Sequence, residues 1–312
     1  MGTTTATGGA PPVSRQPPAP TAPRLHAAVQ RLAGLAVLDG VAGRVGAAVR
    51  GVVRPGPVRD ALSGRALGHA LHPLLTDLPI GTWTSASLLD ALGGRDSDRA
   101  ARRLIGVGIA AALPAAATGL LDWADTEPAD DEVRRVGVVH AVSNVAALSL
   151  YSASLVARRR GAQGRGRALG LAGAVALGVG GHLGGHLSYA KAVGVDATAL
   201  GAGLDDWTDA GAADDLLDDV PVCRSVAGVD VLLVRHDGQV LALADRCSHR
   251  GGPLHEGSVE DGCVTCPLHG SRFRLSDGSV ERGPSPYPQP TFAVRETGGR
   301  LEVRQAYGGP TL

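Results

Sequence analysis

The chain has 312 residues, enough for two domains, and its 44% hydrophobic content with only 3% aromatic residues favours small, close-packing helices. Positive and negative charges balance and no basic stripe is interleaved with aromatics, which excludes nucleic acid as a partner. Four cysteines, all after residue 222, are too few for a secreted disulfide scaffold.

The first 65 residues divide into two parts. Residues 1–23 are rich in Pro, Thr and Ala without an apolar core, which predicts a disordered tail rather than a cleavable signal peptide. Residues 24–65 begin with apolar residues at helical spacing and arginines between them. We expect one or two amphipathic helices that lie against a membrane surface or against the next domain. A soluble helical cap is the alternative.

Four apolar stretches follow within residues 66–190. Each is about the twenty residues that a helix needs to cross a hydrocarbon core. They cover residues 71–92, 103–121, 136–156 and 168–189. The first is the weakest because it carries Asp77 and Asp90. The pattern predicts an α-helical transmembrane four-helix bundle. A soluble four-helix bundle is the alternative. The high content of Gly and Ala disfavours it, because small residues suit contacts between helices inside lipid.

The loops between these stretches differ in charge. Residues 93–103 and 157–167 are rich in arginine, whereas residues 122–135 are mainly acidic. The positive-inside rule then places the first and third loops in the cytoplasm and both termini outside. Arginines 54, 59 and 65, ahead of the first stretch, favour the opposite arrangement. The sequence therefore predicts a multi-pass protein of the cell membrane and leaves the side of its C-terminal domain open.

The pattern changes after residue 190. Residues 191–219 lose the helical periodicity and contain eight aspartates, which predicts a solvated acidic linker. Further along, the runs VDVLLVRH and QVLALA flank Asp237 and Gly238, which predicts a hairpin. Similar short runs continue to residue 307. We expect a small all-β antiparallel domain over residues 220–307.

Two mixed pairs of metal-ligating side chains lie in this β domain. Cys247 and His249 form a Cys-x-His pair, and Cys266 and His269 form a Cys-x-x-His pair. Four ligands in two tight pairs define one site. Zinc is the simplest occupant, but zinc sites commonly pair like with like, whereas a thiolate and an imidazole on each loop suit a binuclear centre.

The segments CSHRGG and CPLHGS resemble the cluster loops of Rieske domains, and the resemblance covers residues 220–306. It implies a [2Fe–2S] cluster with Cys247 and Cys266 on a buried iron and His249 and His269 on the outer iron. The imidazole edges are then expected near solvent, as the electron exit. The run GPSPYPQP resembles the proline-bearing loop that covers such clusters.

Two departures distinguish this sequence from the high-potential, cytochrome bc-type members. Gly252 and Leu268 occupy the positions of their extra disulfide, and Phe273 occupies the position of a Tyr that hydrogen-bonds towards the cluster. Ser271 keeps the Ser that accompanies this Tyr. The resemblance therefore implies the ferredoxin type, with a low to intermediate potential. Two further cysteines are out of ligand register and are expected to be ordinary core residues: Cys223 and Cys263.

Histidines gather at one end of the predicted bundle, with Asp77, Asp122 and Asn144, while the opposite leaflet is expected to be nearly free of such groups. They are His69, His72, His140, His182 and His186. Ionisable residues inside a membrane are costly, so they indicate function. One interpretation is a b-type haem held by two of the last four; another is a quinone or metal site. The third is a set of interfacial histidines that hydrogen-bond to acidic residues and backbone carbonyls.

A second resemblance concerns the helices. The segment HALHPLLTDLPIGTW, with HAVSN later, resembles a family of uncharacterised bacterial four-helix membrane domains over residues 65–190. It supports a membrane location without assigning any chemistry.

The two halves together indicate a membrane-anchored electron-transfer protein, a component of an oxidoreductase system rather than a complete enzyme. Its expected partners are a redox protein or a quinone, and membrane lipid. A redox-sensing or structural anchor is one alternative. An oxygenase-associated component is another, disfavoured because the catalytic domain of an oxygenase would normally follow the Rieske domain and the chain ends at Leu312.

Overall fold

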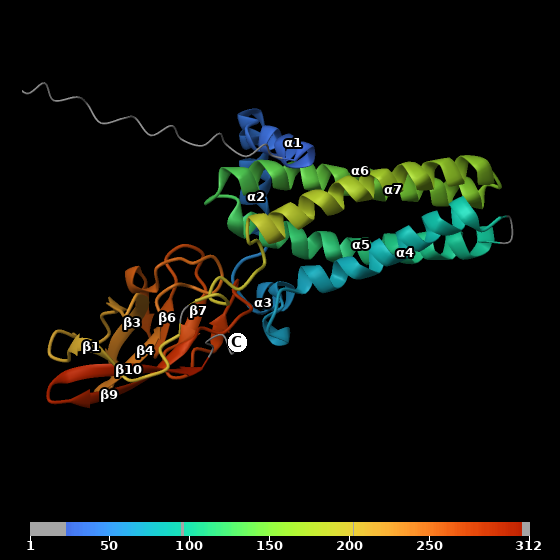
Figure 1. The fold of residues 1–312 in the computed structure, drawn as a ribbon. Coiled ribbons are helices and arrows are strands. Elements are labelled where there is room, and N and C mark those ends of the chain that lie inside the picture. Colours follow the sequence, from blue (N-terminus) through green and yellow to red (C-terminus); the bar gives the residue numbers. More distant parts are fainter. Residues whose placement is uncertain (1–22, 95–96, 202, 308–312) are drawn as a thin grey trace, which may run out of the picture.

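The computed structural model describes residues 23–94, 97–201 and 203–307, so the predicted tail lies almost entirely outside the described residues. A helical region is followed by a β region (Figure 1), which confirms the predicted fold class. The helices are α1 (Arg24–Ala33), η1 (Ala36–Leu38), α2 (Asp39–Val52), α3 (Pro57–Ser63), η2 (Arg65–Leu67), α4 (Leu71–Leu92), α5 (Asp98–Thr126), α6 (Asp131–Arg159), α7 (Gln163–Gly185) and η4 (His186–Ala190).

Helices α4 to α7 form two antiparallel hairpins that pack side by side, α4 with α5 and α6 with α7 (Figure 1). Small residues make this packing close. A β-carbon at Gly108 would overlap the indole of Trp83, and one at Gly137 would overlap that of Trp123. The Trp83 ring also stacks on Tyr151, with ring centroids 4.5 Å apart. The few aromatic side chains of the bundle therefore fill spaces that glycine leaves open.

Three described helical segments are long and apolar enough to cross a membrane: α5, α6 and the continuous stretch Gln163–Ala190. A bent pair, Arg24–Ala33 with Ala36–Val52, would count as a fourth candidate. Helix α4 coincides with the first predicted span but is not among these candidates, because Asp77, Asp90 and other polar residues lower its hydropathy. By length and composition, the described helical region thus contains three or four candidate membrane spans.

The end of the bundle away from the β domain holds a buried ion pair. Asp90, near the end of α4, contacts Arg158, near the end of α6, and their side chains are 1% and 0% exposed. The expectation that this end is nearly free of ionisable groups is therefore wrong. Helix α6 continues through Arg158, which the sequence pattern assigned to a loop, and so carries the guanidinium into the bundle.

Helices α1 and α2 pack against the other end of the bundle (Figure 1). Arg135 on α6 binds Asp39 at the start of α2 (2.8 Å), and Arg50 on α2 binds Glu127 just after α5 (2.9 Å). For residues 24–65 the sequence predicted contact with a membrane surface or with the next domain. The structure shows contact with the next domain.

The β region contains two antiparallel sheets. The larger has six strands in the order β1-β10-β9-β4-β3-β2, and the smaller has four in the order β5-β6-β7-β8. The predicted hairpin joins β3 to β4 through Asp237 and Gly238, both with positive φ. The strands are β1 (Thr208–Ala212), β2 (Val222–Val226), β3 (Val229–His236), β4 (Gln239–Ala244), β5 (Ser258–Glu260), β6 (Cys263–Thr265), β7 (Arg272–Arg274), β8 (Val280–Arg282), β9 (Thr291–Thr297) and β10 (Arg300–Tyr307).

Strand β1 lies within residues 191–219, which the sequence predicted as a solvated linker. It pairs with β10, Thr208 opposite Val303 and Asp209 opposite Glu302. The β domain therefore begins before residue 220. The small residues of TDAGA carry almost no strand signal of their own, so this strand depends on its pairing partner.

Candidate metal centre

The first predicted pair of ligands lies on the loop that follows β4. The N–H of Cys247 donates to the carbonyl of Gly252 (2.9 Å), and the N–H of Gly251 donates to the carbonyl of Cys247 (2.7 Å). Gly251 has φ +70°, a left-handed conformation that glycine adopts without steric cost. The loop thus folds tightly around the cysteine.

The second pair lies on the loop between β6 and β7, which repeats this pattern. The N–H of Cys266 donates to the carbonyl of Ser271 (2.8 Å), and the N–H of Gly270 donates to the carbonyl of Cys266 (3.1 Å). Gly270 has φ +75°, like its counterpart in the first loop. Two loops of similar shape therefore each present one cysteine and one histidine.

The two thiols meet in the core between the loops. Cys247 is 0% exposed and Cys266 is 2% exposed, within a hydrophobic cluster that includes Phe273. Their sulfur atoms lie within hydrogen-bonding range of each other. A β-carbon on Gly252 would lie 3.1 Å from the Cys266 Sγ and 2.8 Å from a methyl carbon of Leu268. Glycine at this position therefore lets the loops close over the sulfurs.

The two imidazoles also lie together. The rings of His249 and His269 have centroids 5.0 Å apart and planes inclined by 80°. The Nδ1 atom of His249 is buried and has no hydrogen-bond partner among the described residues. Buried polar atoms are nearly always partnered, so this nitrogen marks a place where a ligand belongs.

The surroundings set protonation states suited to binding a metal. Burial lowers the pKa of His249 to about 3, with help from His269 and Arg250, and burial also lowers the pKa of His269. The hydrogen bond from Cys247 lowers the pKa of Cys266 to about 6, whereas the same contact and burial raise the pKa of Cys247. Two neutral imidazoles, a thiol that ionises readily at Cys266 and a second thiol beside it are the donors that a mixed thiolate and imidazole centre needs.

Comparison with known proteins identifies the β domain. Residues 206–293 match the family model of the Rieske [2Fe-2S] domain. The anthranilate 1,2-dioxygenase ferredoxin subunit of Burkholderia cepacia is 34% identical over 102 residues, which are 33% of this chain and 94% of that protein. This chain belongs to the Rieske family. Membership implies a [2Fe–2S] cluster in the β domain, and the unpartnered Nδ1 of His249 fits it.

Other relatives match the same part of the chain. The 3-phenylpropionate/cinnamic acid dioxygenase ferredoxin subunit of Photorhabdus laumondii is 36% identical over 75 residues, 24% of this chain and 71% of that protein. Among solved structures, the ferredoxin of carbazole 1,9a-dioxygenase from Nocardioides aromaticivorans is 30% identical, covers 31% of this chain and 97% of its own, and has a TM-score of 0.30. Residues 68–197 match a second family, a predicted membrane protein domain (DUF2231), as the second resemblance implied.

A third loop ties the two cluster loops of the Rieske domain together. The hydroxyl of Ser271 accepts a hydrogen bond from the N–H of Ser285 (3.0 Å), and the hydroxyls of Ser285 and Ser248 lie 2.9 Å apart. Buried Gln289 accepts from the N–H of Ser248 (3.0 Å) and donates to the carbonyl of Ala244 (2.7 Å). Sequence reasoning found Ser271 and this proline-rich loop but missed Ser248, Ser285 and Gln289. The only signal for Ser285 and Gln289 was the GPSPYPQP run, and the only one for Ser248 was its place in CSHRGG.

The Rieske domain docks on the segment that precedes the bundle. Asp60 on α3 accepts a hydrogen bond from the N–H of Gly283 (2.9 Å), and Arg65 on η2 donates from Nε to the carbonyl of Val280 (2.9 Å). Figure 1 shows α3 between the bundle and the β region. Residues 57–67 therefore link the two regions, a role that their sequence did not predict.

Behind this contact, a buried ion pair faces the histidine side of the site. Arg59 on α3 pairs with Asp125 at the end of α5, with side chains 10% and 3% exposed. The charges of both act on His269, and that of Arg59 acts on His249. The imidazoles therefore lie on the side of the β domain toward the helical region, within electrostatic range of this ion pair. Both rings are half-buried, so part of each stays accessible to solvent, where the sequence predicted the imidazole edges.

The structure brings two of the candidate bundle histidines near each other. His72 on α4 hydrogen-bonds through Nδ1 to the carbonyl of Ala115 (2.9 Å), and His140 on α6 does the same to the carbonyl of Gly180 (2.8 Å). The two rings are close enough to interact electrostatically. Backbone carbonyls are thus the partners of these histidines, as one of the three interpretations expected.

The other two candidates lie elsewhere. His186 places Nε2 2.9 Å from a carboxylate oxygen of Glu132, and its ring is 6.4 Å from that of His26. His182 is exposed. Although these residues are four apart in sequence, only the side chain of His186 is largely enclosed by protein; α7 gives way to a π-helical turn at this residue.

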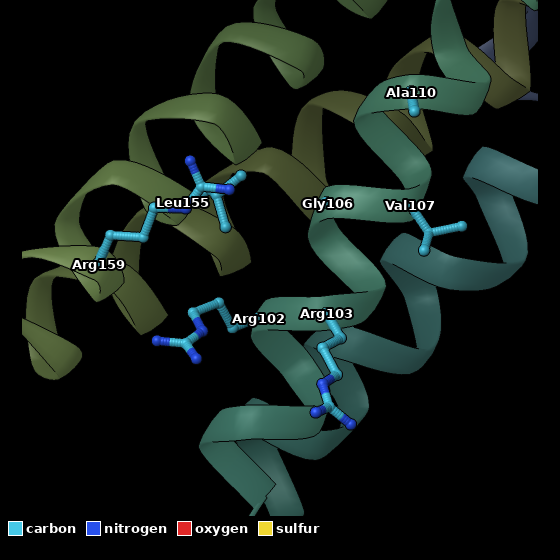
Figure 2. Close-up of a pocket in the computed structure, with 7 residues that line it drawn as sticks. All are labelled: Arg102, Arg103, Gly106, Val107, Ala110, Leu155 and Arg159. Atoms are coloured by element: carbon cyan, nitrogen blue, oxygen red, sulfur yellow. The ribbon is translucent and has the colours of Figure 1, made fainter.

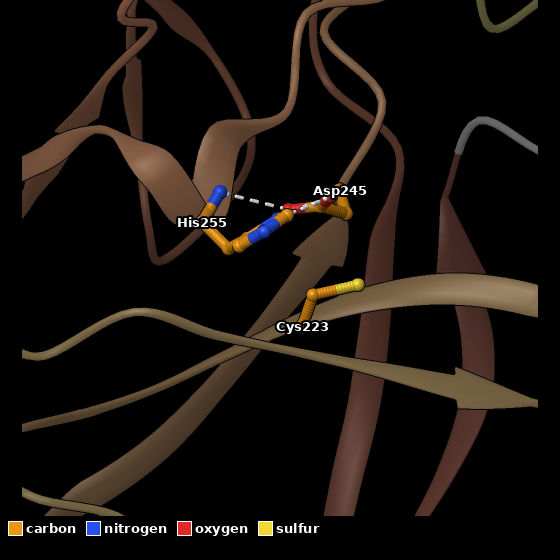
Figure 3. A group of neighbouring side chains, drawn as sticks. All are labelled: Cys223, Asp245 and His255. Atoms are coloured by element: carbon orange, nitrogen blue, oxygen red, sulfur yellow. Dashed lines mark hydrogen bonds and ion pairs between the residues drawn. The ribbon is translucent and has the colours of Figure 1, made fainter.

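Three further donor groups meet in the Rieske domain: Cys223, Asp245 and His255 (Figure 3). Their ligand atoms all lie within 4.8 Å of one another. One oxygen of Asp245 accepts from the ring Nδ1 of His255 and the other from its backbone N–H, both at 2.8 Å. Burial and nearby carboxylates raise the pKa of Cys223 to about 12, so the thiol stays protonated. The group is a hydrogen-bonded cluster that fastens η5 (Leu254–Glu256) to the end of β4.

Proposed function

We propose that this protein is a membrane-anchored carrier of single electrons, in which Cys247 and Cys266 hold one iron of a [2Fe–2S] cluster and His249 and His269 hold the other. The observation that carries the proposal is the pair of similar loops that bring these buried thiols and neutral imidazoles together. When bound, such a cluster accepts and releases one electron at a time. The relatives named above are ferredoxin subunits of dioxygenase systems, which supports a carrier rather than a complete enzyme.

The chain's own residues set the path of the electron. The imidazoles of His249 and His269 lie within electrostatic range of Arg59 on α3, and that of His269 also of Asp125 at the end of α5. The electron therefore leaves toward the helical region, to a redox protein that docks there or to a quinone in the membrane. The sequence lacks the extra cysteines of the high-potential type at Gly252 and Leu268. This supports a ferredoxin-type potential.

His72 and His140 are the residues that favour a second redox centre in the bundle, a b-type haem. Each Nδ1 is held by a backbone carbonyl, which leaves Nε2 for a metal. Asn144 donates to the Nε2 of His140 at 3.0 Å and would have to release it. The visible spectrum of reduced full-length protein tests this centre. Sharp haem bands that disappear in His140→Ala support it, and a spectrum with cluster absorption alone rules it out.

Cys266→Ser tests the cluster. We expect full-length protein, extracted from membranes with detergent, to lose the visible absorption and the electron paramagnetic resonance signal of a Rieske cluster, because the thiolate ligand is gone. Cys263→Ser is the matched control, since Cys263 is also buried but lies outside the two loops, and its spectra should match the wild type. An intact cluster spectrum in Cys266→Ser would contradict the assignment, and protein in the soluble fraction without detergent would contradict the anchor.

A further inference from the structure

A groove of about 800 Å³ lies between α5 and α6 at the end of the bundle away from the Rieske domain (Figure 2). Three arginines line its mouth: Arg102 and Arg103 in the second turn of α5, and Arg159, the last residue of α6. Figure 2 shows Arg102 and Arg159 extending into the space between the two helices, while Arg103 extends toward the start of α5.

Among the described residues these three arginines have no counter-ion, unlike Arg158 and Arg167 nearby. Within the described part of the chain, none of them takes part in an ion pair or a side-chain hydrogen bond, and all three are exposed. At the same end of the bundle, Arg158 pairs with Asp90, and Arg167 pairs with Asp98 at 2.8 Å. The mouth of the groove therefore gathers three uncompensated positive charges.

The groove becomes apolar away from the arginines. Gly106, Val107 and Ala110 continue along α5, and Leu155 lies one turn before Arg159 on α6. From Arg102 to Ala110 the helix rises about 12 Å, at 1.5 Å per residue. A β-carbon on Gly106 would meet nothing within 4 Å, so this residue leaves the groove open. A cationic mouth above an apolar channel of this length matches a phosphate attached to a hydrocarbon chain.

We infer that this groove binds an anionic phospholipid, its headgroup phosphate on the three arginines and one acyl chain along Gly106, Val107 and Leu155. The inference rests on the membrane placement proposed above, because both walls are helices apolar enough to span. Arginines also crowd the loops at this end, which the positive-inside rule assigns to the cytoplasmic face, where anionic lipids are enriched. A free phosphate would need no apolar channel, so lipid is the better match.

Native mass spectrometry of full-length protein in detergent, titrated with phosphatidylglycerol or phosphatidylcholine, tests the site. Wild type should bind one phosphatidylglycerol about tenfold more tightly than phosphatidylcholine, because three guanidinium groups meet the net negative charge of its headgroup. The triple variant Arg102→Gln, Arg103→Gln, Arg159→Gln should lose that preference. A matched variant, Arg99→Gln, Arg160→Gln, Arg165→Gln, removes the same charge from exposed positions at the same end and should keep it.

Gly106→Leu provides an independent test, because it fills the channel without touching the arginines. It should weaken binding of both lipids, whereas Gly81→Leu, at an exposed helix position that is equally uncrowded, should not. Equal loss in both triple variants would mean a general charge effect and overturn the site. If inorganic phosphate competes with phosphatidylglycerol, the groove binds free anions, and the assignment to a lipid is wrong. Failure here leaves the cluster spectrum and membrane extraction unchanged, so it is distinguishable from failure of the proposed function.

Discussion

Asp125→Asn is expected to raise the reduction potential of the cluster and to destabilise the protein strongly. Asp125 is the buried partner of Arg59, and its charge acts on the His269 imidazole. Reduction adds negative charge to the cluster, so losing this carboxylate favours the reduced state. In general, a unit charge at a separation of about 10 Å and an effective dielectric constant of about 20 shifts a one-electron potential by tens of millivolts. Leaving Arg59 buried without a partner costs about 3–5 kcal/mol. Redox titration and thermal unfolding in detergent measure the two effects.

The control for Asp125→Asn removes both charges at once. Arg59→Met with Asp125→Leu replaces the ion pair by apolar side chains, which is often close to neutral for stability. Its potential should lie near the wild type, because the opposite effects of the two charges on His269 largely cancel. Arg59→Gln alone should lower the potential. An unchanged potential in both single variants would mean that the helical region does not influence the cluster.

The cluster loops and the fold class could be predicted from the sequence because their signals are local. Cys247 and His249 are two residues apart, Cys266 and His269 are three apart, and the apolar stretches give helices wherever they are long. The hairpin at Asp237 and Gly238 follows from turn chemistry alone.

Contacts between distant segments could not be predicted in this way. Arg59 and Asp125 are 66 residues apart, and nothing at either position indicates a partner. Gln289 is a single amide in a proline-rich run, yet it joins two loops through backbone groups. Arg158 lies in an arginine-rich stretch that is typical of a loop. It is buried because α6 continues through this stretch. In each case the missing information is which elements pack together, a property of the tertiary structure.

Asp60→Ala with Arg65→Ala is expected to expose the histidine side of the cluster. The two side chains make hydrogen bonds to Gly283 and Val280 that hold the Rieske domain on the segment before the bundle. At about 1 kcal/mol each, their loss raises the undocked population by roughly 30-fold. Oxidation of the reduced cluster by ferricyanide, a small soluble acceptor, should become faster by up to about 30-fold, because undocking removes the helical region from beside the half-buried imidazoles of His249 and His269.

The matched control removes an aspartate and an arginine far from this contact. Asp209→Ala with Arg300→Ala breaks an exposed ion pair between β1 and β10 and should leave the oxidation rate unchanged. Equal rates in wild type and the docking variant would mean that soluble acceptors already reach His249 and His269, and the proposed electron exit toward the helices would lose its support. Faster oxidation only in the docking variant would mean that docking directs the electron toward the membrane side, which is the advantage of joining a Rieske domain to membrane helices in one chain.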